Sequence, residues 1–251
     1  MNKNLNIEET FTLAVENHKN NNFQIAENLY KKILEINPNS AGVYYNLGIM
    51  YKELKKYLEA KDCYQKAIQI DPNYTQAHIN LGILFKELGD LKKSINSFQK
   101  VINIQPNNAD VHNHFGLTLN KMGEHKKAMN CYEKAIQINP NHASAYTNLG
   151  IVHKELGEYQ KAINCYEKAI QINPNYANVY YNYGNMLQEL KKMQKAKSCY
   201  EKLLNLDPNY KKGYSSYGIL LLKISQHNKG LAYIRKGDGV IRFTQNNVKI
   251  I

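Results

Sequence analysis

The sequence has little arginine, although it is strongly basic. Its 251 residues contain 33 Lys and Arg against 21 Asp and Glu, a net charge of +12, but only Arg235 and Arg242 are arginines. Arginine makes the bidentate contacts to phosphate and guanine that nucleic-acid recognition uses, whereas lysines spread over helix surfaces mainly favour solubility. The composition therefore argues against nucleic acid as the partner, despite the basic pI.

Long apolar runs are also absent. The longest aliphatic run is Ile219 to Leu222, far short of the roughly 20 apolar residues that a membrane-spanning helix needs. The N-terminal residues 1–6 lack the apolar centre of a signal peptide. These absences predict a cytoplasmic protein with no membrane span.

The chain lacks the motifs of common catalytic and metal sites. Its four cysteines are too few for a disulfide framework in a chain of this size. They include no CxxC pair that would hold structural zinc. No phosphate-binding loop, dinucleotide fingerprint, GxSxG or HExxH motif occurs. We therefore expect no active site, metal or cofactor within these residues.

Proline and glycine, by contrast, recur with a single period. All six prolines follow one another at intervals of 34 residues, and six glycines keep the same interval. The prolines are Pro38, Pro72, Pro106, Pro140, Pro174 and Pro208, and the glycines are Gly48, Gly82, Gly116, Gly150, Gly184 and Gly218. A fixed period of this length predicts a stack of helix–turn–helix repeats.

Each repeat is predicted to contain two helices. With Ala41 as position 1, the periodic glycine is position 8 and the periodic proline is position 32. Proline ends the second helix and moves the residue before it out of the α region. Glycine at position 15, as in Gly89, Gly123 and Gly157, suits the left-handed residue that ends a first helix. These two breaks leave helices of about 12 to 14 residues.

Further positions recur and carry a family resemblance. The pattern is aromatic at 4, Leu at 7, Gly at 8, Tyr at 11, Ala at 20, aromatic at 24, Ala at 27 and Pro at 32. In residues 41–74 it reads Tyr44, Leu47, Gly48, Tyr51, Ala60, Tyr64, Ala67 and Pro72. This pattern resembles the tetratricopeptide repeat, with Tyr or His where the family usually has Trp. The resemblance implies an all-α, right-handed superhelical solenoid of about seven repeats.

The resemblance covers residues 7–244 and leaves an N-terminal extension, 1–6, and a C-terminal tail, 245–251. The repeats are 7–40, 41–74, 75–108, 109–142, 143–176, 177–210 and 211–244. The first and last depart from the pattern, as end repeats commonly do. Residues 240–243 and 248–251 are predicted to be extended. They either cap the repeat array or begin a further domain.

One stripe of the first helix is a candidate binding surface. Positions 2, 6, 9 and 13 share one side of that helix, and the family resemblance implies that they line a concave groove. Position 6 holds Asn46, Asn80, His114, Asn148 and Asn182 in the central repeats. Carboxamides donate and accept hydrogen bonds, so such a row can hold a polypeptide backbone. The alternative is that asparagine is simply abundant here and tolerates an exposed helix face.

Residues at three other positions of the first helix are further candidates for contact with the ligand. Position 9 is apolar at Ile49, Ile83, Leu117 and Ile151 and then becomes Asn185. Position 5 offers Tyr45 and Tyr181, which either anchor a ligand or contact the neighbouring repeat. Position 12 holds Lys52, Lys86 and Lys154, next to glutamates at position 13. Those lysines either belong to a solvated lip or select an acidic ligand segment.

The resulting prediction is a non-enzymatic scaffold that binds an extended segment of a partner protein. The asparagine row resembles the peptide-binding superhelix of protein O-GlcNAc transferases. The alternative function is therefore substrate recruitment for a larger or associated enzyme, such as a glycosyltransferase. Self-association through exposed repeat ends is a third hypothesis. The partner, the pathway and the oligomeric state do not follow from the sequence.

Overall fold

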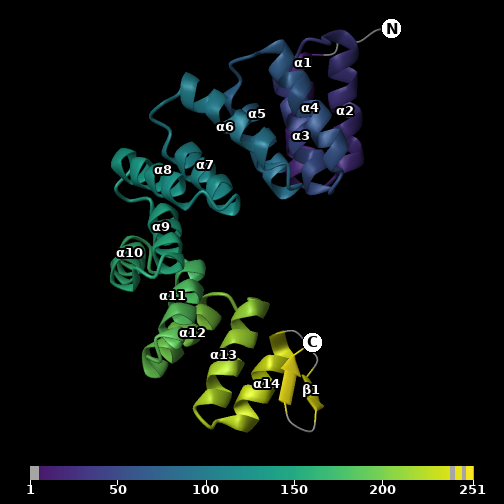
Figure 1. Ribbon diagram of the computed structural model, residues 1–251. Coiled ribbons are helices and arrows are strands. Elements are labelled where there is room, and N and C mark those ends of the chain that lie inside the picture. Colours follow the sequence, from purple (N-terminus) through teal and green to yellow (C-terminus); the bar gives the residue numbers. More distant parts are fainter. Residues whose placement is uncertain (1–5, 238–240, 245–246, 251) are drawn as a thin grey trace. The chain divides into compact units, whose positions relative to one another are not determined.

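The computed structural model of the protein describes residues 6–237, 241–244 and 247–250 (Figure 1). It divides into two compact units, residues 1–127 and 128–251, here named the N-terminal body and the C-terminal body. The described residues form fourteen helices and one two-stranded sheet. None of these helices is both long enough and apolar enough to cross a membrane.

The helices come in pairs, one pair for each 34-residue period. The first helices, or A helices, are α1 (Ile7–Lys19), α3 (Ala41–Glu53), α5 (Thr75–Glu87), α7 (Ala109–Lys121), α9 (Ala143–Glu155), α11 (Ala177–Glu189) and α13 (Lys211–Lys223). The second helices, or B helices, are α2 (Phe23–Ile36), α4 (Tyr57–Ile70), α6 (Leu91–Ile104), α8 (His125–Ile138), α10 (Tyr159–Ile172), α12 (Met193–Leu206) and α14 (His227–Gly237). This arrangement confirms the predicted all-α repeat architecture.

The turn between repeats explains why an Asn or Asp precedes most of the prolines. The Oδ1 atom of Asn37 accepts a hydrogen bond from the backbone N–H of Asn39 at 3.3 Å. Asp71, Asn139, Asn173 and Asp207 make the equivalent bond at 3.0 Å. The short side chain thereby closes a turn as the proline ends the B helix.

The turn between the A and B helices requires a left-handed residue. Gly89, Gly123 and Gly157 have φ angles of 84°, 80° and 76°, as the sequence predicts. The other four repeats place a non-glycine residue at the same position with a similar angle. These residues are Asn21, Lys55, Lys191 and Ser225, with φ between 57° and 64°. The repeat geometry therefore imposes this conformation even where the side chain disfavours it.

Close packing of an aromatic ring on glycine joins the two helices in four pairs: α3 with α4, α5 with α6, α9 with α10, and α11 with α12. A Cβ atom on Gly48 would lie 2.5 Å from Cε1 of Tyr64, and one on Gly150 would lie 2.8 Å from Cε1 of Tyr166. Both tyrosines, at position 24 of their repeats, are fully buried. The periodic glycine thus allows the B helix to bring its aromatic side chain against the A helix.

A β-hairpin follows the last helix. Strands β1 (Ile241–Thr244) and β2 (Asn247–Ile250) pair antiparallel, with Ile241 opposite Ile250, and β1 contacts α14. The sequence places residues 241–244 inside the seventh repeat, but the helical part of that repeat ends at Gly237. The two extended segments predicted there correspond closely to these strands, although residues 240 and 251 lie outside the described residues.

Candidate peptide-binding surface

Within each body, A helices of successive repeats lie next to each other. In the N-terminal body α1 contacts α3 and α5 contacts α7, and in the C-terminal body α11 contacts both α9 and α13. Positions 5, 6, 9, 12 and 13 of these helices form a surface that we call the A-helix stripe. It contains all twelve side chains that the sequence nominates for peptide binding.

Asn46 and Asn182 occupy equivalent, half-exposed places at position 6 of the A-helix stripe. The Nδ2 atom of Asn46 donates to the carbonyl oxygen of Gly42 at 2.8 Å, and that of Asn182 donates to the carbonyl oxygen of Asn178 at 2.9 Å. Each bond spans one turn of the same helix and orients the carboxamide. The Oδ1 atom takes no part in this bond and can accept a hydrogen bond from a ligand.

Asn80 instead connects two repeats. Its Nδ2 atom donates to the hydroxyl oxygen of Tyr45, at position 5 of the preceding repeat, at 3.3 Å. The ring of Tyr45 also lies 5.1 Å from that of Tyr74, and Tyr181 makes the equivalent contact with Tyr210 at 5.2 Å. Position 5 therefore contacts neighbouring side chains at the repeat boundary, which was one of the two interpretations of its tyrosines.

The remaining members of the position-6 row differ from one another. The ring of His114 stacks on Phe98, with centroids 5.8 Å apart and planes 10° apart. Asn148 is half-buried on α9. The histidine thus contributes a flat aromatic surface where the other four positions contribute an amide.

The apolar row at position 9 is half-buried, so it offers contact area without being sealed in the core. Ile49 packs against the cluster that contains Ala60, Tyr64 and Leu84. Ile83 packs against a separate cluster formed by Phe98, Val101 and Val111. Each isoleucine keeps part of its side chain accessible next to a position-6 residue of the same helix.

Charged side chains at positions 12 and 13 pair across the repeat boundary. Nζ of Lys52 lies 3.0 Å from a carboxylate oxygen of Glu87, and Nζ of Lys154 lies 2.6 Å from one of Glu189. Nε2 of His18 makes the same kind of contact at the preceding boundary, 3.0 Å from a carboxylate oxygen of Glu53. Lys52 and Lys154 therefore already have carboxylate partners, which favours the solvated-lip interpretation for those two residues.

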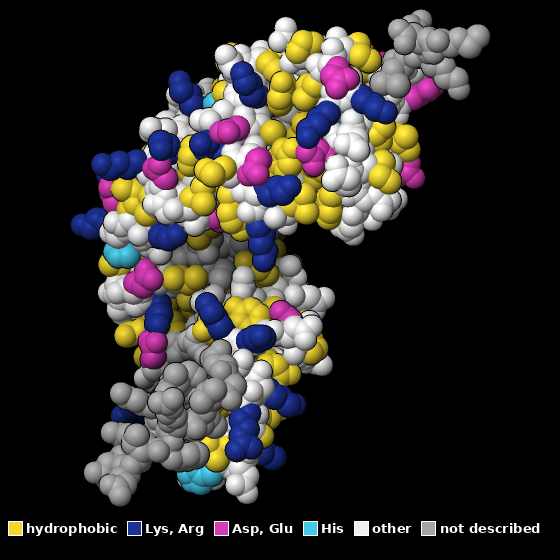
Figure 2. Space-filling model, turned by 90° about the vertical axis from the view of Figure 1, so that its right-hand side faces the viewer, with side chains coloured by type: hydrophobic (Ala, Val, Ile, Leu, Met, Phe, Trp, Pro, Cys, Tyr) yellow, Lys and Arg dark blue, Asp and Glu magenta, His cyan; other side chains and the backbone are white. Residues whose placement is uncertain are grey.

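The distribution of charged side chains on the surface of the N-terminal body agrees with this pairing. On the face that Figure 2 shows, its Lys and Arg side chains stand among Asp and Glu side chains and do not merge into one basic patch. Surface ion pairs of this kind contribute only about 0–1 kcal/mol each. They join side chains of neighbouring repeats.

Lys86 differs from the other two lysines of its row. The residue at position 13 of the next repeat is Lys121, whose Nζ atom donates to the carbonyl oxygen of Lys86 at 3.2 Å. Burial lowers the pKa of Lys86, and the neighbouring charges of Lys52 and Lys121 lower it further, while Glu87 acts in the opposite direction. This cation is therefore partly desolvated and lies next to a second cation.

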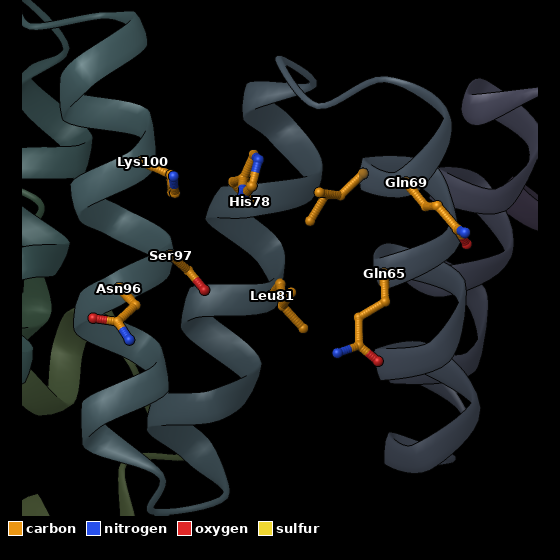
Figure 3. A pocket seen from close by; sticks show the side chains of 8 residues that line it. Gln65, Gln69, His78, Leu81, Asn96, Ser97 and Lys100 are labelled. Atoms are coloured by element: carbon orange, nitrogen blue, oxygen red, sulfur yellow. The ribbon is translucent and has the colours of Figure 1, made fainter.

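A separate pocket of about 400 Å³ lies on the side of the B helices. Figure 3 shows Gln65 and Gln69 of α4 on one side of it, Asn96, Ser97 and Lys100 of α6 on the other, and His78 and Leu81 of α5 between them. Nε2 of His78 is held 2.9 Å from the carbonyl oxygen of Pro72. None of the predicted peptide-binding residues lines this pocket.

The cysteines recur at position 23 and pack between helices. Cys63, Cys131, Cys165 and Cys199 are free and half-buried. Burial raises the pKa of the Cys63 thiol to about 12 and that of each of the other three to about 11. These thiols are therefore protonated near neutral pH, in contrast to reactive thiolates. Among the residues with described side chains, no group of three or more His, Cys, Asp or Glu is arranged to hold a metal ion.

Comparison with known families supports the interpretation of the repeat. Sequence profiles described as "Tetratricopeptide repeat" match residues 41–74, 63–96, 143–176 and 165–198. A profile described as "TPR repeat" matches residues 84–123 and 116–157. Together these matches run without a gap from residue 41 to residue 198. The chain belongs to the tetratricopeptide repeat family.

Several solved structures share the fold of this chain. A tetratricopeptide repeat protein from Parabacteroides merdae has a TM-score of 0.79 at 19% identity, covering 92% of this chain and 91% of that one. MamA has a TM-score of 0.60 at 27% identity, covering 66% and 96%. YrrB, described as having an unusual peptide-binding site, has a TM-score of 0.55 at 21% identity, covering 78% and 97%. No curated protein matches the sequence.

Proposed function

We propose that this tetratricopeptide repeat protein is a scaffold that binds an extended polypeptide segment along its A-helix stripe. The observation that supports this proposal best is the row of oriented carboxamides at position 6. In Asn46 and Asn182, the Nδ2 atom is held by the helix itself while Oδ1 can still accept a hydrogen bond. Such groups can bond to a peptide backbone with little ordering on binding.

The spacing of the A helices suits an extended ligand. Packed helices lie about 8–10 Å apart, and an extended chain advances about 3.3 Å per residue. One position-6 side chain would then meet about every third ligand residue within a body. The half-buried position-9 row, represented by Ile49 and Ile83, would contact apolar ligand side chains between those hydrogen bonds.

The comparisons support the general class of this function. YrrB shares the fold, and its description refers to a peptide-binding site. At 21% identity that similarity does not transfer particular residues, so the residues are proposed from this structure alone. Backbone recognition by amides would make the scaffold tolerant of partner sequence, with selectivity supplied by the rows on either side.

The proposal can be tested with two matched variants. In the first, Asn46, Asn80, Asn148 and Asn182 are all changed to Ala. In the second, four exposed asparagines of the B helices are changed to Ala instead: Asn28, Asn96, Asn130 and Asn164. Peptides selected on the wild-type protein from a random 12-residue display library would serve as ligands, and their affinities would be measured by calorimetry.

The expected result is a loss of affinity of at least about 10-fold in the A-helix variant, since each net hydrogen bond is worth about 0.5–1.5 kcal/mol. The B-helix variant should bind as the wild type does. Equal affinities for all three proteins, with unchanged circular dichroism, would overturn the proposal.

A further inference from the structure

The boundary between neighbouring A helices follows a simple rule. Where position 12 is Lys52 or Lys154, a glutamate at position 13 of the next repeat, Glu87 or Glu189, pairs with it, and His18 at position 12 of the first repeat contacts Glu53 in the same way. The partners in each pair are separated by 35 residues. These contacts occur in both bodies, so they belong to the repeat and not to one local environment.

The boundary between α5 and α7 breaks this rule inside the N-terminal body. Position 12 is again a lysine, Lys86, but position 13 of the next repeat is Lys121. In place of a carboxylate, the Lys121 ammonium approaches the backbone carbonyl of Lys86 at 3.2 Å. The nearest glutamate of the pattern, Glu87, is already paired with Lys52. Lysines thus occupy positions 12 and 13 at this boundary, where the α3–α5 and α9–α11 boundaries hold a Lys–Glu ion pair.

Neither burial nor the neighbouring lysines stabilise the charged form of Lys86. Lys86 is half-buried, and burial lowers its pKa because the charged form is partly removed from water. At position 13 of the next repeat, where Lys52 and Lys154 each meet a glutamate, Lys86 has Lys121. A pre-positioned, incompletely solvated cation beside a second cation is the arrangement expected for a site that receives an anion from outside.

We propose that Lys86 and Lys121 form a binding site for the side-chain carboxylate of an Asp or Glu residue in the bound polypeptide. This inference rests on the proposed function, and it adds that the bound segment contains an acidic residue. The incoming carboxylate would take the place that Glu87 and Glu189 occupy at the equivalent boundaries. It would accept hydrogen bonds from the Lys86 and Lys121 ammonium groups.

The surrounding residues add a second feature to the ligand. Ile83 lies three residues before Lys86 on the same helix, so one turn of about 5 Å separates position 9 from position 12. That rise corresponds to one or two residues of an extended chain. We therefore expect an apolar side chain one or two residues away from the acidic one.

The substitution Lys121→Glu provides a direct test, because it gives Lys86 the carboxylate that Lys52 and Lys154 have at the equivalent boundaries. The exposed Lys126→Glu substitution, in the same body, makes an identical change of net charge away from the site and serves as the control. A random 12-residue peptide library with amidated C-termini would be selected on the wild type and on both variants at the same salt concentration. Amidation excludes the C-terminal carboxylate as the recognised group.

Wild type and Lys126→Glu should enrich Asp and Glu at one peptide position, and the best peptide should lose about 10-fold in affinity when that residue becomes its amide. Lys121→Glu should bind peptides but show neither the enrichment nor the 10-fold difference. Peptide binding with no acidic preference, or the same preference in Lys121→Glu, would overturn this inference and leave the proposed function intact. A wild-type protein that selects no peptide would overturn both.

Discussion

The buried tyrosines at position 24 differ in whether the hydroxyl group has a hydrogen-bond partner. Tyr30, Tyr64, Tyr132 and Tyr166 bury hydroxyl groups for which the described residues provide no hydrogen-bond partner. Tyr200, by contrast, donates to Oδ1 of Asn185 at 2.7 Å. Asn185 is the residue that interrupts the apolar row at position 9. It therefore has a structural partner in the B helix of its own repeat.

This contrast predicts opposite effects for one substitution at two equivalent sites. Tyr166→Phe removes a buried hydroxyl that makes no bond, so the free energy of unfolding should stay constant or rise by up to about 1 kcal/mol. Tyr200→Phe leaves Asn185 without its donor and should cost about 1–2 kcal/mol. Urea denaturation of the two variants measures the difference.

The double variant Tyr200→Phe with Asn185→Ile serves as the control, because it rebuilds the apolar arrangement of the repeat that contains Ile83 and Phe98. It should recover most of the lost stability. Equal destabilisation by Tyr166→Phe and Tyr200→Phe would contradict this account of the buried phenols.

Individual side-chain contacts are also the feature that sequence analysis predicts least well. The repeat pattern marks Gly48 and Tyr64 as recurring positions, and the structure shows that these two residues pack against each other. The pattern cannot show that Asn185 bonds to Tyr200 or that Lys52 pairs with Glu87. Both contacts depend on which atoms meet across a helix boundary, and periodicity alone carries no such information.

At the scale of the helix, the turn between A and B helices sets a common conformation. Lys55 and Lys191 adopt φ angles of 59° and 57°, where glycine stands in three other repeats. A left-handed conformation costs a non-glycine residue roughly 1–2 kcal/mol. These two turns therefore carry strain that packing of the helix pair compensates.

Replacing either lysine with glycine should raise the free energy of unfolding by about 1 kcal/mol, because glycine adopts this conformation without a steric penalty. The reverse substitution, Gly89→Lys, should lower it by a similar amount. Thermal and urea denaturation would provide both values. A loss of stability in Lys55→Gly and Lys191→Gly would show that these turns are not strained.

The sequence predicts the helices better than it predicts the conformation of the turns or the end of the last repeat. Proline and glycine mark the helix ends directly, so the observed helix pairs begin at positions 1 and 17 of each period. The left-handed turn at Lys55 and Lys191 lacks that mark, since the conformation is imposed by the closing helix pair. The repeat period also places residues 241–244 in the last repeat, whereas the structure has a strand there, since short apolar segments are compatible with several structures.

At the scale of the whole molecule, the repeats place equivalent side chains on neighbouring helices in each body. The family, the fold class and the composition of the candidate surface follow from the sequence, because all three depend on periodicity. The sequence does not show which side chains of that surface are already paired within the protein. Lys52 and Lys154 prove to be paired within the protein, whereas Lys86 has a lysine, Lys121, at position 13 of the next repeat. The structure thereby reduces the number of position-12 lysines that are candidates for contact with a ligand.

The most direct test of the central claim observes the position-6 carboxamides themselves. Nuclear magnetic resonance can follow the side-chain Nδ2 amide signals of Asn46, Asn80, Asn148 and Asn182 as a library-selected peptide is added. The control signals are those of the B-helix asparagines Asn28, Asn96, Asn130 and Asn164. We predict saturable shifts in the A-helix set and none in the control set. Shifts confined to the B-helix set, or binding that leaves all eight signals unchanged, would contradict the proposed binding surface.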